Sequence, residues 1–365
     1  MSKFIFNNVR IAGLACAVPS FVQKIDAAKS STPDYVRSFQ KQTGMQERHI
    51  SLTEQTATDL AYGATQRALE HAGWDVQHLD ALIFLSQTPD FNPGTGNAFI
   101  MHHRLRMPTT AMAYDITLGC ASVPAGLATA CSLLQQESMH RILLLCGDAQ
   151  WHFYADKAAL LADQRFIHGE GVTATLLERV PGSNSHLLFE LFSDGSGYRF
   201  LFNPIGGVRN AWRKQYHITL PDGVEANLDG RGNYMDGLEI TSFSTGVVVD
   251  NLRGFLCDAG TTIDNYDGLV LHQANMQIVK TIAKRLHVPM EKVPISLDRY
   301  GNTSGASPLL TMCDAYSGLA KQLRLLICAF GIGLAWGIAD IEIDTDIITP
   351  IFNYDGRSDE FLLSR

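Results

Sequence analysis

The sequence contains no CxxC pair, although it has seven cysteines. The cysteines are odd in number, scattered along the chain and mostly set in apolar runs. They are Cys16, Cys120, Cys131, Cys146, Cys257, Cys313 and Cys328. Neither a disulfide framework nor a cysteine-based metal site is expected from this pattern. A reducing compartment is the natural one for such a chain, so we predict a cytoplasmic location.

The sequence also lacks a basic excess and long hydrophobic runs. Its formal net charge is -8, and its apolar runs are broken by Gly, Asp or Arg well before 18 residues. The first twenty residues show no apolar core of a signal peptide. We therefore expect no general affinity for nucleic acid and no membrane span. An acidic partner would need a local basic patch.

Several catalytic motifs are absent too. There is no GxSxG, P-loop or HExxH motif, and His168, His186 and His217 do not have metal-ligand spacing. The glycine-rich "GIGLAWG" lies too near the end of the chain for a dinucleotide-binding βαβ unit. No metal and no resident cofactor are expected.

The segments that are present alternate between strand-like and helix-like patterns. Apolar runs over Ala81–Gln87, Arg141–Ala149 and Gly171–Val180 predict buried strands, and Thr56–Gly73 predicts an amphipathic helix ending at a glycine. This alternation predicts an α/β layered fold.

Three markers recur in the same order in the second half. "DALIFLSQ" at Asp80 is answered by "DGLVLHQA" at Asp267, 187 residues later. "GCASVPAGL" at Gly119 corresponds to "GNTSGASPL" at Gly301, 182 residues later. "RILLLC" at Arg141 corresponds to "RLLIC" at Arg324, 183 residues later. The nearly constant offset predicts an internal duplication.

The duplication gives Cys120 and Asn302 equivalent places, each after a glycine and before a helix of small residues. Two such helix starts should converge on a pseudo-twofold axis, and His272 should end a strand near the same axis. A helix N-terminus should lower the pKa of the Cys120 thiol and favour a nucleophilic thiolate. Each residue has a plainer interpretation by itself: a packed thiol, a satisfied core histidine, or an asparagine in a turn.

"HQAN" and "GNTSGAS", thirty residues apart, together with the upstream cysteine, resemble the β-ketoacyl-acyl-carrier-protein synthase III branch of the thiolase-like condensing enzymes. "TGMQERHI", "HGEGVTATLL" and "AFGIGLAWGIADIEI" extend the resemblance from about Val9 to Ile343. It implies a thiolase-like fold, in which two pseudo-twofold-related βαβαβαββ halves form five layers (αβαβα).

The resemblance also implies an organisation and a set of roles. The halves would be residues 1–180 and 229–350, with an insertion over 181–228, a tail over 351–365, and loops at about 85–107 in a homodimer interface. Cys120 would carry the acyl group, while His272 and Asn302 would bind a malonyl-type thioester and stabilise its enolate. The backbone N–H groups of Cys120 and Ile332 would form the oxyanion hole, with Ile332 standing where the family usually has glycine.

The chain departs from the family where coenzyme A would bind. Ser38, Gln42 and Gln277 replace a Trp and two Arg residues, so charge-assisted phosphate binding is lost. We therefore expect substrates to arrive as phosphopantetheine thioesters on an acyl carrier protein rather than on coenzyme A. Basic residues on two segments are the candidate docking sites, with an ordinary solvated face as the equal alternative. They are Lys280, Lys284, Arg285, Arg209, Arg213 and Lys214.

The segment "FNPGT" at residues 91–95 is also unlike the segment that usually shapes the acyl pocket in the family. The length of the acyl chain therefore cannot be transferred from the family to this protein.

Three functions are compatible with the residues. The first is decarboxylative condensation in fatty acid or polyketide-type biosynthesis, which uses Cys120, His272 and Asn302 together. The second is an acyltransferase that moves an acyl group from Cys120 to an alcohol or amine with His272 as base. The third, a non-catalytic partner subunit, is disfavoured because such subunits are expected to lose these residues. The presence of Asn302 favours condensation.

Overall fold

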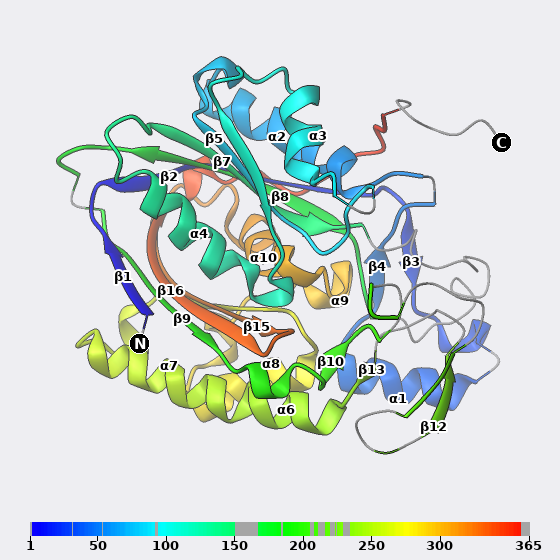
Figure 1. Ribbon diagram of the computed structural model, residues 1–365. Helices are drawn as coiled ribbons and strands as arrows, with labels where there is room; N and C mark the ends of the chain where they lie inside the picture. Colours follow the sequence, from blue (N-terminus) through cyan, green and yellow to red (C-terminus); the bar gives the residue numbers. More distant parts are fainter. Residues whose placement is uncertain are drawn as a thin grey trace.

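Two β-sheets form the centre of the protein in the computed structural model (Figure 1). The structure describes residues 2–30, 32–52, 54–91, 94–149, 167–183, 185–204, 208–210, 216–219, 223, 225–228 and 234–358. The first sheet, in spatial order, contains β17 (Phe352–Asn353), β2 (Val9–Val18), β8 (Gly171–Arg179), β7 (Arg141–Asp148), β5 (Ala81–Leu85) and β6 (Met112–Ile116). The second contains β1 (Ser2–Phe6), β9 (Leu187–Ser193), β16 (Ala335–Asp344), β15 (Gln322–Gly331) and β14 (Gly268–Leu271).

Helices fill three layers around these sheets, which gives the predicted αβαβα order (Figure 1). The helices between the sheets are α4 (Ser122–Leu133) and α10 (Ser307–Tyr316). Those on the outer face of the first sheet are α2 (Ala57–Ala72) and α3 (Asn97–Arg104). Those on the outer face of the second sheet are α6 (Gly237–Thr245), α7 (Val247–Asp258) and α8 (Met276–Arg285).

Shorter elements complete the described chain. The remaining helices and strands are α1 (Pro33–Thr43), α9 (Leu297–Tyr300), β3 (Val22–Lys24), β4 (Glu47–His49), β10 (Leu201–Phe202), β11 (Tyr216–Thr219), β12 (Glu225–Leu228) and β13 (Tyr234–Met235). The 3₁₀ turns are η1 (Ala27–Lys29), η2 (Val76–His78), η3 (Gly119–Ala121), η5 (Gly195–Gly197), η6 (Ile263–Asn265), η7 (Met290–Lys292), η8 (Ser304–Ala306) and η9 (Thr345–Ile347).

The two sheets repeat one connection pattern. In the first, β5 is parallel to β7, β7 is antiparallel to β8, and β8 is antiparallel to β2. In the second, β14 is parallel to β15, β15 is antiparallel to β16, and β16 is antiparallel to β9. α4 precedes β7 as α10 precedes β15. The shared elements of β2–α2–β5–α3–β6–α4–β7–β8 and β9–α7–β14–α8–α10–β15–β16 therefore correspond, in agreement with the predicted duplication. The first unit has the predicted βαβαβαββ order, whereas the described residues of the second form no strand opposite β6.

Two strands of the second sheet lie outside the segment predicted for the second half. β1 comes from the first residues of the chain, and β9 falls within the predicted insertion at residues 181–228. Their antiparallel pairing, with Phe4 opposite Phe189, extends the sheet on the edge away from β14. β9 has no recognisable sequence counterpart, so the repeat markers did not reveal it. The domain boundaries and the interface role of residues 85–107 stay predictions.

Local chemistry explains why the helices form where they do. Thr56 and Asp59 make a capping box at the start of α2, and Gly73 ends it with φ 64°, as the sequence predicts. The inner helix α4 packs closely on the first sheet, because a Cβ added at Gly126 would lie 2.3 Å from Leu85 Cδ1. Small residues thus let α4 run between two sheets. Within the described residues, the helices are too short or too polar to span a bilayer.

Candidate active site

The starts of the two inner helices meet at the centre of the molecule. Cys120 lies in η3, directly before α4, and Asn302 lies two residues before η8, which leads into α10. Cys120 Sγ is 3.9 Å from Ser304 Oγ, and a Cβ added at Gly305 would lie 2.9 Å from the Gly119 carbonyl oxygen. The predicted convergence of the two helix starts is present. Each start is a 3₁₀ turn, and Asn302 precedes its turn.

Ser304 joins the three predicted site residues. Its backbone N–H donates to Asn302 Oδ1 at 3.0 Å, its hydroxyl lies beside Cys120 Sγ, and its backbone carbonyl faces the His272 ring. Ser304 has φ 52°, in the left-handed region that residues other than glycine seldom adopt. The Asn302 side chain stabilises this turn, as asparagine commonly does. This hydrogen bond uses the side-chain oxygen of Asn302, so the amide group is held in place and its two hydrogens can donate to another group.

His272 follows β14 and is only 2% exposed. Its backbone N–H donates to the Cys328 carbonyl at 2.9 Å, and its Nδ1 lies 2.7 Å from Ser307 Oγ. Burial lowers the pKa of His272 to about 3, with a further effect from His168, so the ring is neutral near pH 7. In the tautomer with hydrogen on Nε2, Ser307 donates to Nδ1 and Nε2–H is the one donor of the neutral ring.

The prediction of a lowered pKa for Cys120 is wrong for this structure. The side chain is partly exposed, but protein surrounds the sulfur, and this burial raises its pKa to about 11. Asp148 raises the pKa further, whereas the contact with Ser304 lowers it. Desolvation disfavours the thiolate more than the local hydrogen bond favours it.

The turn between β15 and β16 borders the cysteine. A Cβ added at Gly331 would lie 2.7 Å from Cys120 Cβ, and one added at Gly119 would lie 3.3 Å from Ile332 Cβ. Gly119 has φ 56° as well, a conformation that favours glycine, and an added Cβ would be tightly packed there. Ile332 is therefore adjacent to the cysteine loop, and its predicted oxyanion-hole role stays a prediction.

His168 has no metal-ligand spacing in the sequence, yet it lies beside Asn302. The two residues pair as an isolated bridge: Asn302 N–H donates to Ile167 O at 2.9 Å, and Gly169 N–H donates to Asn302 O at 3.1 Å. Burial and the nearby Arg48 lower the pKa of His168 to about 4. In the sequence, only its place in "HGEG" marks His168. The pairing of this segment with the Asn302 loop joins distant parts of the chain, so local sequence does not reveal it.

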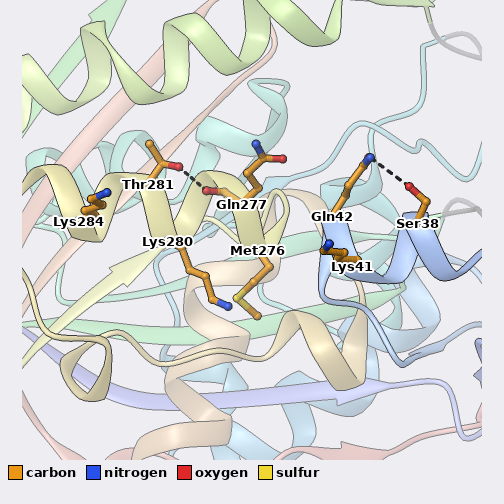
Figure 2. Close-up of a pocket in the computed structure, with 8 residues that line it drawn as sticks. All are labelled: Ser38, Lys41, Gln42, Met276, Gln277, Lys280, Thr281 and Lys284. Carbon is orange, nitrogen blue, oxygen red and sulfur yellow. Dashed lines mark hydrogen bonds between the residues drawn. The ribbon is translucent and has the colours of Figure 1, made fainter.

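A surface groove of about 530 Å³ runs between α1 and α8 (Figure 2). It gathers all three positions where coenzyme A-binding residues were predicted to be lost, and it adds three lysines. The lining residues are Ser38, Lys41, Gln42, Met276, Gln277, Lys280, Thr281 and Lys284. Lys280 and Lys284 are exposed on α8, four residues apart. Lys41 was not among the predicted docking residues.

The other predicted docking residues differ in placement. Arg285 donates to the backbone carbonyl of Thr245 and so connects α8 with α6. Arg209 is exposed but is not among the groove-lining residues. Arg213 and Lys214 lie outside the described residues.

A second cavity, of about 230 Å³, adjoins the loop after β5. Several polar side chains line it, together with parts of the segment predicted to shape the acyl pocket. The lining residues are Ser86, Gln87, Pro89, Phe91, Gly94, Thr95, Gly96, Asn97, Asp115 and Thr117. Gln87 extends from this cavity to the cysteine, because its Nε2 donates to Ser304 Oγ at 2.8 Å. Among the described residues, no group of three or more His, Cys, Asp or Glu side chains could hold a metal ion.

Comparisons with known proteins agree with this architecture. Two family models match the chain: 3-oxoacyl-[acyl-carrier-protein (ACP)] synthase III over residues 114–195 and its C-terminal model over residues 256–343. The β-ketoacyl-[acyl-carrier-protein] synthase III of Caldanaerobacter subterraneus is 35% identical over 305 residues, or 82% of this chain and 87% of the relative. That of Rhodopirellula baltica is 31% identical over 91% of this chain and 97% of the relative.

Solved structures give the same result. The 3-oxoacyl-(acyl-carrier-protein) synthase of Burkholderia xenovorans has a TM-score of 0.84 and 29% identity, with 96% of this chain and 98% of that chain covered. A priming β-ketosynthase of the R1128 polyketide pathway has a TM-score of 0.73 at 22% identity, with 93% and 97% covered, and is a likeness of fold alone. The fold is thiolase-like, as the sequence predicts.

Proposed function

This chain belongs to the 3-oxoacyl-[acyl-carrier-protein] synthase III family, and we propose that it condenses an acyl group held on Cys120 with a malonyl-type thioester. The product would be a β-ketoacyl thioester for fatty acid or polyketide-type biosynthesis. One observation carries the proposal: Ser304 contacts Cys120, Asn302 and His272, which come from three separate parts of the chain. A nucleophile and two hydrogen-bond donors thereby share one small site.

In the first half-reaction, the Cys120 sulfur attacks the carbonyl carbon of the donor thioester. A new carbon–sulfur bond forms, and the donor thiol leaves with the proton that Cys120 gives up. Backbone N–H groups of Cys120 and Ile332 would stabilise the oxyanion of the tetrahedral intermediate. The raised pKa of Cys120 means that thiolate forms as part of this step rather than persisting in the resting enzyme.

In the second half-reaction, His272 Nε2–H and the Asn302 amide would donate to the carbonyl oxygen of the malonyl thioester. The bond to the carboxylate breaks, carbon dioxide leaves, and the electron pair is held as an enolate. The enolate carbon then attacks the acyl–Cys120 carbonyl, and Cys120 leaves as a thiolate that regains a proton. A neutral histidine can fill this role, because its Nε2–H donates a hydrogen bond while the ring carries no charge.

The same pKa weighs against simple acyl transfer with His272 as base. A group whose pKa is about 3 is a weak base near neutral pH, so it would remove a proton from an alcohol or amine poorly. Asn302, oriented by Ser304, would have no evident function in such a transfer. Condensation uses both residues.

We propose that an acyl carrier protein delivers the substrates at the groove between α1 and α8. Lys41, Lys280 and Lys284 give this groove a positive charge that suits an acidic carrier and its phosphopantetheine phosphate (Figure 2). Arg285 is less available because it already bonds to Thr245. We also predict that the protein forms a homodimer and is located in the cytosol.

The condensation is tested by measuring β-ketoacyl product with three proteins: the natural chain, Cys120→Ala and Asn302→Ala. We expect product from the natural chain alone. Asn302→Ala should still carry an acyl group on Cys120, as measured by intact mass. If Asn302→Ala condenses at the natural rate, or if Cys120→Ala is still acylated, the assignment is wrong.

Docking is tested with Lys280→Glu and Lys284→Glu together. We expect KM for malonyl carrier protein to rise about tenfold, which corresponds to about 1.4 kcal/mol, and KM for malonyl pantetheine to stay unchanged. Lys321→Glu is the matched control, because Lys321 is exposed but does not line the groove. An equal rise with the control variant would contradict the docking site.

A further inference from the structure

Gln87 is a polar residue in the loop after β5, and its side chain reaches the cysteine site from the cavity side. Its Nε2 donates to Ser304 Oγ at 2.8 Å, and Ser304 Oγ is 3.9 Å from Cys120 Sγ. Its Oε1 lies close to Gly119, where an added Cβ would be 3.3 Å away. The amide is therefore held between the two helix starts.

The chemistry of the amide group sets the direction of the Gln87–Ser304 hydrogen bond. An amide nitrogen carries only hydrogens, so Gln87 must donate and Ser304 must accept. A serine hydroxyl has one hydrogen, and when its oxygen accepts from Gln87 that hydrogen is directed to another acceptor. Cys120 Sγ, 3.9 Å away, can accept that hydrogen, although either atom of this pair can be the donor.

The backbone around Gln87 is itself fixed. Asp148, at the end of β7 and 4% exposed, accepts from Gln87 N–H at 2.7 Å and from Thr88 N–H at 3.1 Å, both through Oδ1. The Ser86 hydroxyl donates to the same oxygen at 3.0 Å. One buried carboxylate thus holds the turn that presents the Gln87 side chain.

We propose that Gln87 is a positioning residue that turns the Ser304 hydroxyl toward the Cys120 sulfur. The inference rests on the proposed role of Cys120 as nucleophile. The Ser304 hydrogen bond stabilises negative charge on sulfur twice: when Cys120 attacks the donor thioester, and when it leaves the acyl group during condensation. The effect of Ser304 on the pKa of Cys120 has the matching direction, downward.

The other titratable side chains near this sulfur do not favour the thiolate. Asp148 raises the pKa of Cys120, and the buried Cys146 on β7 is electrostatically coupled to Cys120. His272 faces the Ser304 carbonyl, and the backbone of His168 pairs with that of Asn302; both rings are neutral near pH 7. The Ser304 hydroxyl is thus the side chain that favours the thiolate.

The test is the pH profile of Cys120 alkylation by iodoacetamide, read by peptide mass, in Gln87→Glu, Gln87→Met and Ser304→Gly. Glycine suits the positive φ at residue 304, and both Gln87 replacements keep the side-chain length. Glutamate accepts the Ser304 hydrogen and withdraws it from the sulfur. We expect each profile to move to higher pH, by about one unit for Gln87→Glu and Ser304→Gly and less for Gln87→Met.

A double variant separates a relay through Ser304 from a packing effect. Gln87→Met should change the profile in the natural background and should leave it unchanged in the Ser304→Gly background. An equal shift in both backgrounds, or an unshifted profile in Ser304→Gly, overturns the proposal. Alkylation needs neither acyl donor nor extender, so this result is independent of whether the chain condenses malonyl thioesters. Thermal unfolding of each variant identifies any loss of fold.

Discussion

Ser307 is buried at the start of α10 and contacts His272, so its removal should affect one half-reaction and spare the other. Its hydroxyl lies 2.7 Å from His272 Nδ1 and accepts from the Gln273 backbone N–H at 3.1 Å. Ser307→Ala removes both interactions without adding bulk. The His272 ring then loses the partner that keeps hydrogen on Nε2.

The size of the effect follows from the hydrogen bonds lost. Leaving a buried polar group unpaired costs about 1–3 kcal/mol, and each 1.4 kcal/mol or so lost from a transition state is about a factor of ten in rate. We therefore expect decarboxylation of malonyl carrier protein to slow by about ten- to a hundredfold. Acylation of Cys120 should stay within about twofold, because Cys120 contacts Ser304 rather than Ser307.

The assay measures the two half-reactions separately: acyl–Cys120 by intact mass, and carbon dioxide release from malonyl carrier protein. Ser244→Ala is the matched control, since Ser244 is a buried hydroxyl in α6 that bonds to the Ile240 carbonyl. Equal slowing of both half-reactions by Ser307→Ala would refute the reasoning, as would an unchanged rate of carbon dioxide release.

Three predictions concern stability, each read from denaturant unfolding. Gly126→Ala should destabilise the fold by about 1–3 kcal/mol, because the added Cβ would press on the first sheet. Gly254→Ala is the control in α7: its Cβ meets nothing within 4 Å, so the change should stabilise the fold by about 0.5–1 kcal/mol. Equal effects of the two variants would contradict the packing account. Thr56→Ala should lower stability by about 1 kcal/mol through loss of the α2 cap, and an unchanged free energy would argue against the capping box. The folded-state pKa values of His272 and His168 are about 3 and about 4, below the ordinary value of 6.5. Between pH 6.5 and these lowered values the unfolded chain binds more protons than the folded one, so the stability should fall as the pH drops below 6.5. His272→Gln should make that fall shallower, and an unchanged slope would refute the neutral, buried histidine.

Much of the fold follows from local sequence. The strands at residues 81, 141 and 171 are apolar runs bounded by polar or glycine residues, and α2 carries its own start and stop signals. The repeat markers located the second set of strands because buried strands and small-residue helices tolerate few residue types. Such features depend on neighbours in the chain, so sequence reveals them.

The rest depends on contacts between distant segments. Pairing of β1 with β9 joins residues more than 180 positions apart, and no short pattern signals it. The pKa of Cys120 was predicted from its helix start, but distant segments enclose the sulfur, and this burial raises the pKa. Ser304 and Gln87 meet only because the fold brings the loop after β5 against the turn before α10. Hydrogen-bond direction across a site is a tertiary property.

The most direct test of the central claim is a single-turnover chase followed by intact mass. The protein is first loaded with an acyl donor, and malonyl carrier protein is then added. We predict that the mass increase on Cys120 appears with the donor and disappears on the chase, with one β-ketoacyl product and one carbon dioxide for each acyl group lost. An acyl group that stays on Cys120 after the chase, or that leaves without carbon dioxide, would contradict condensation at this site.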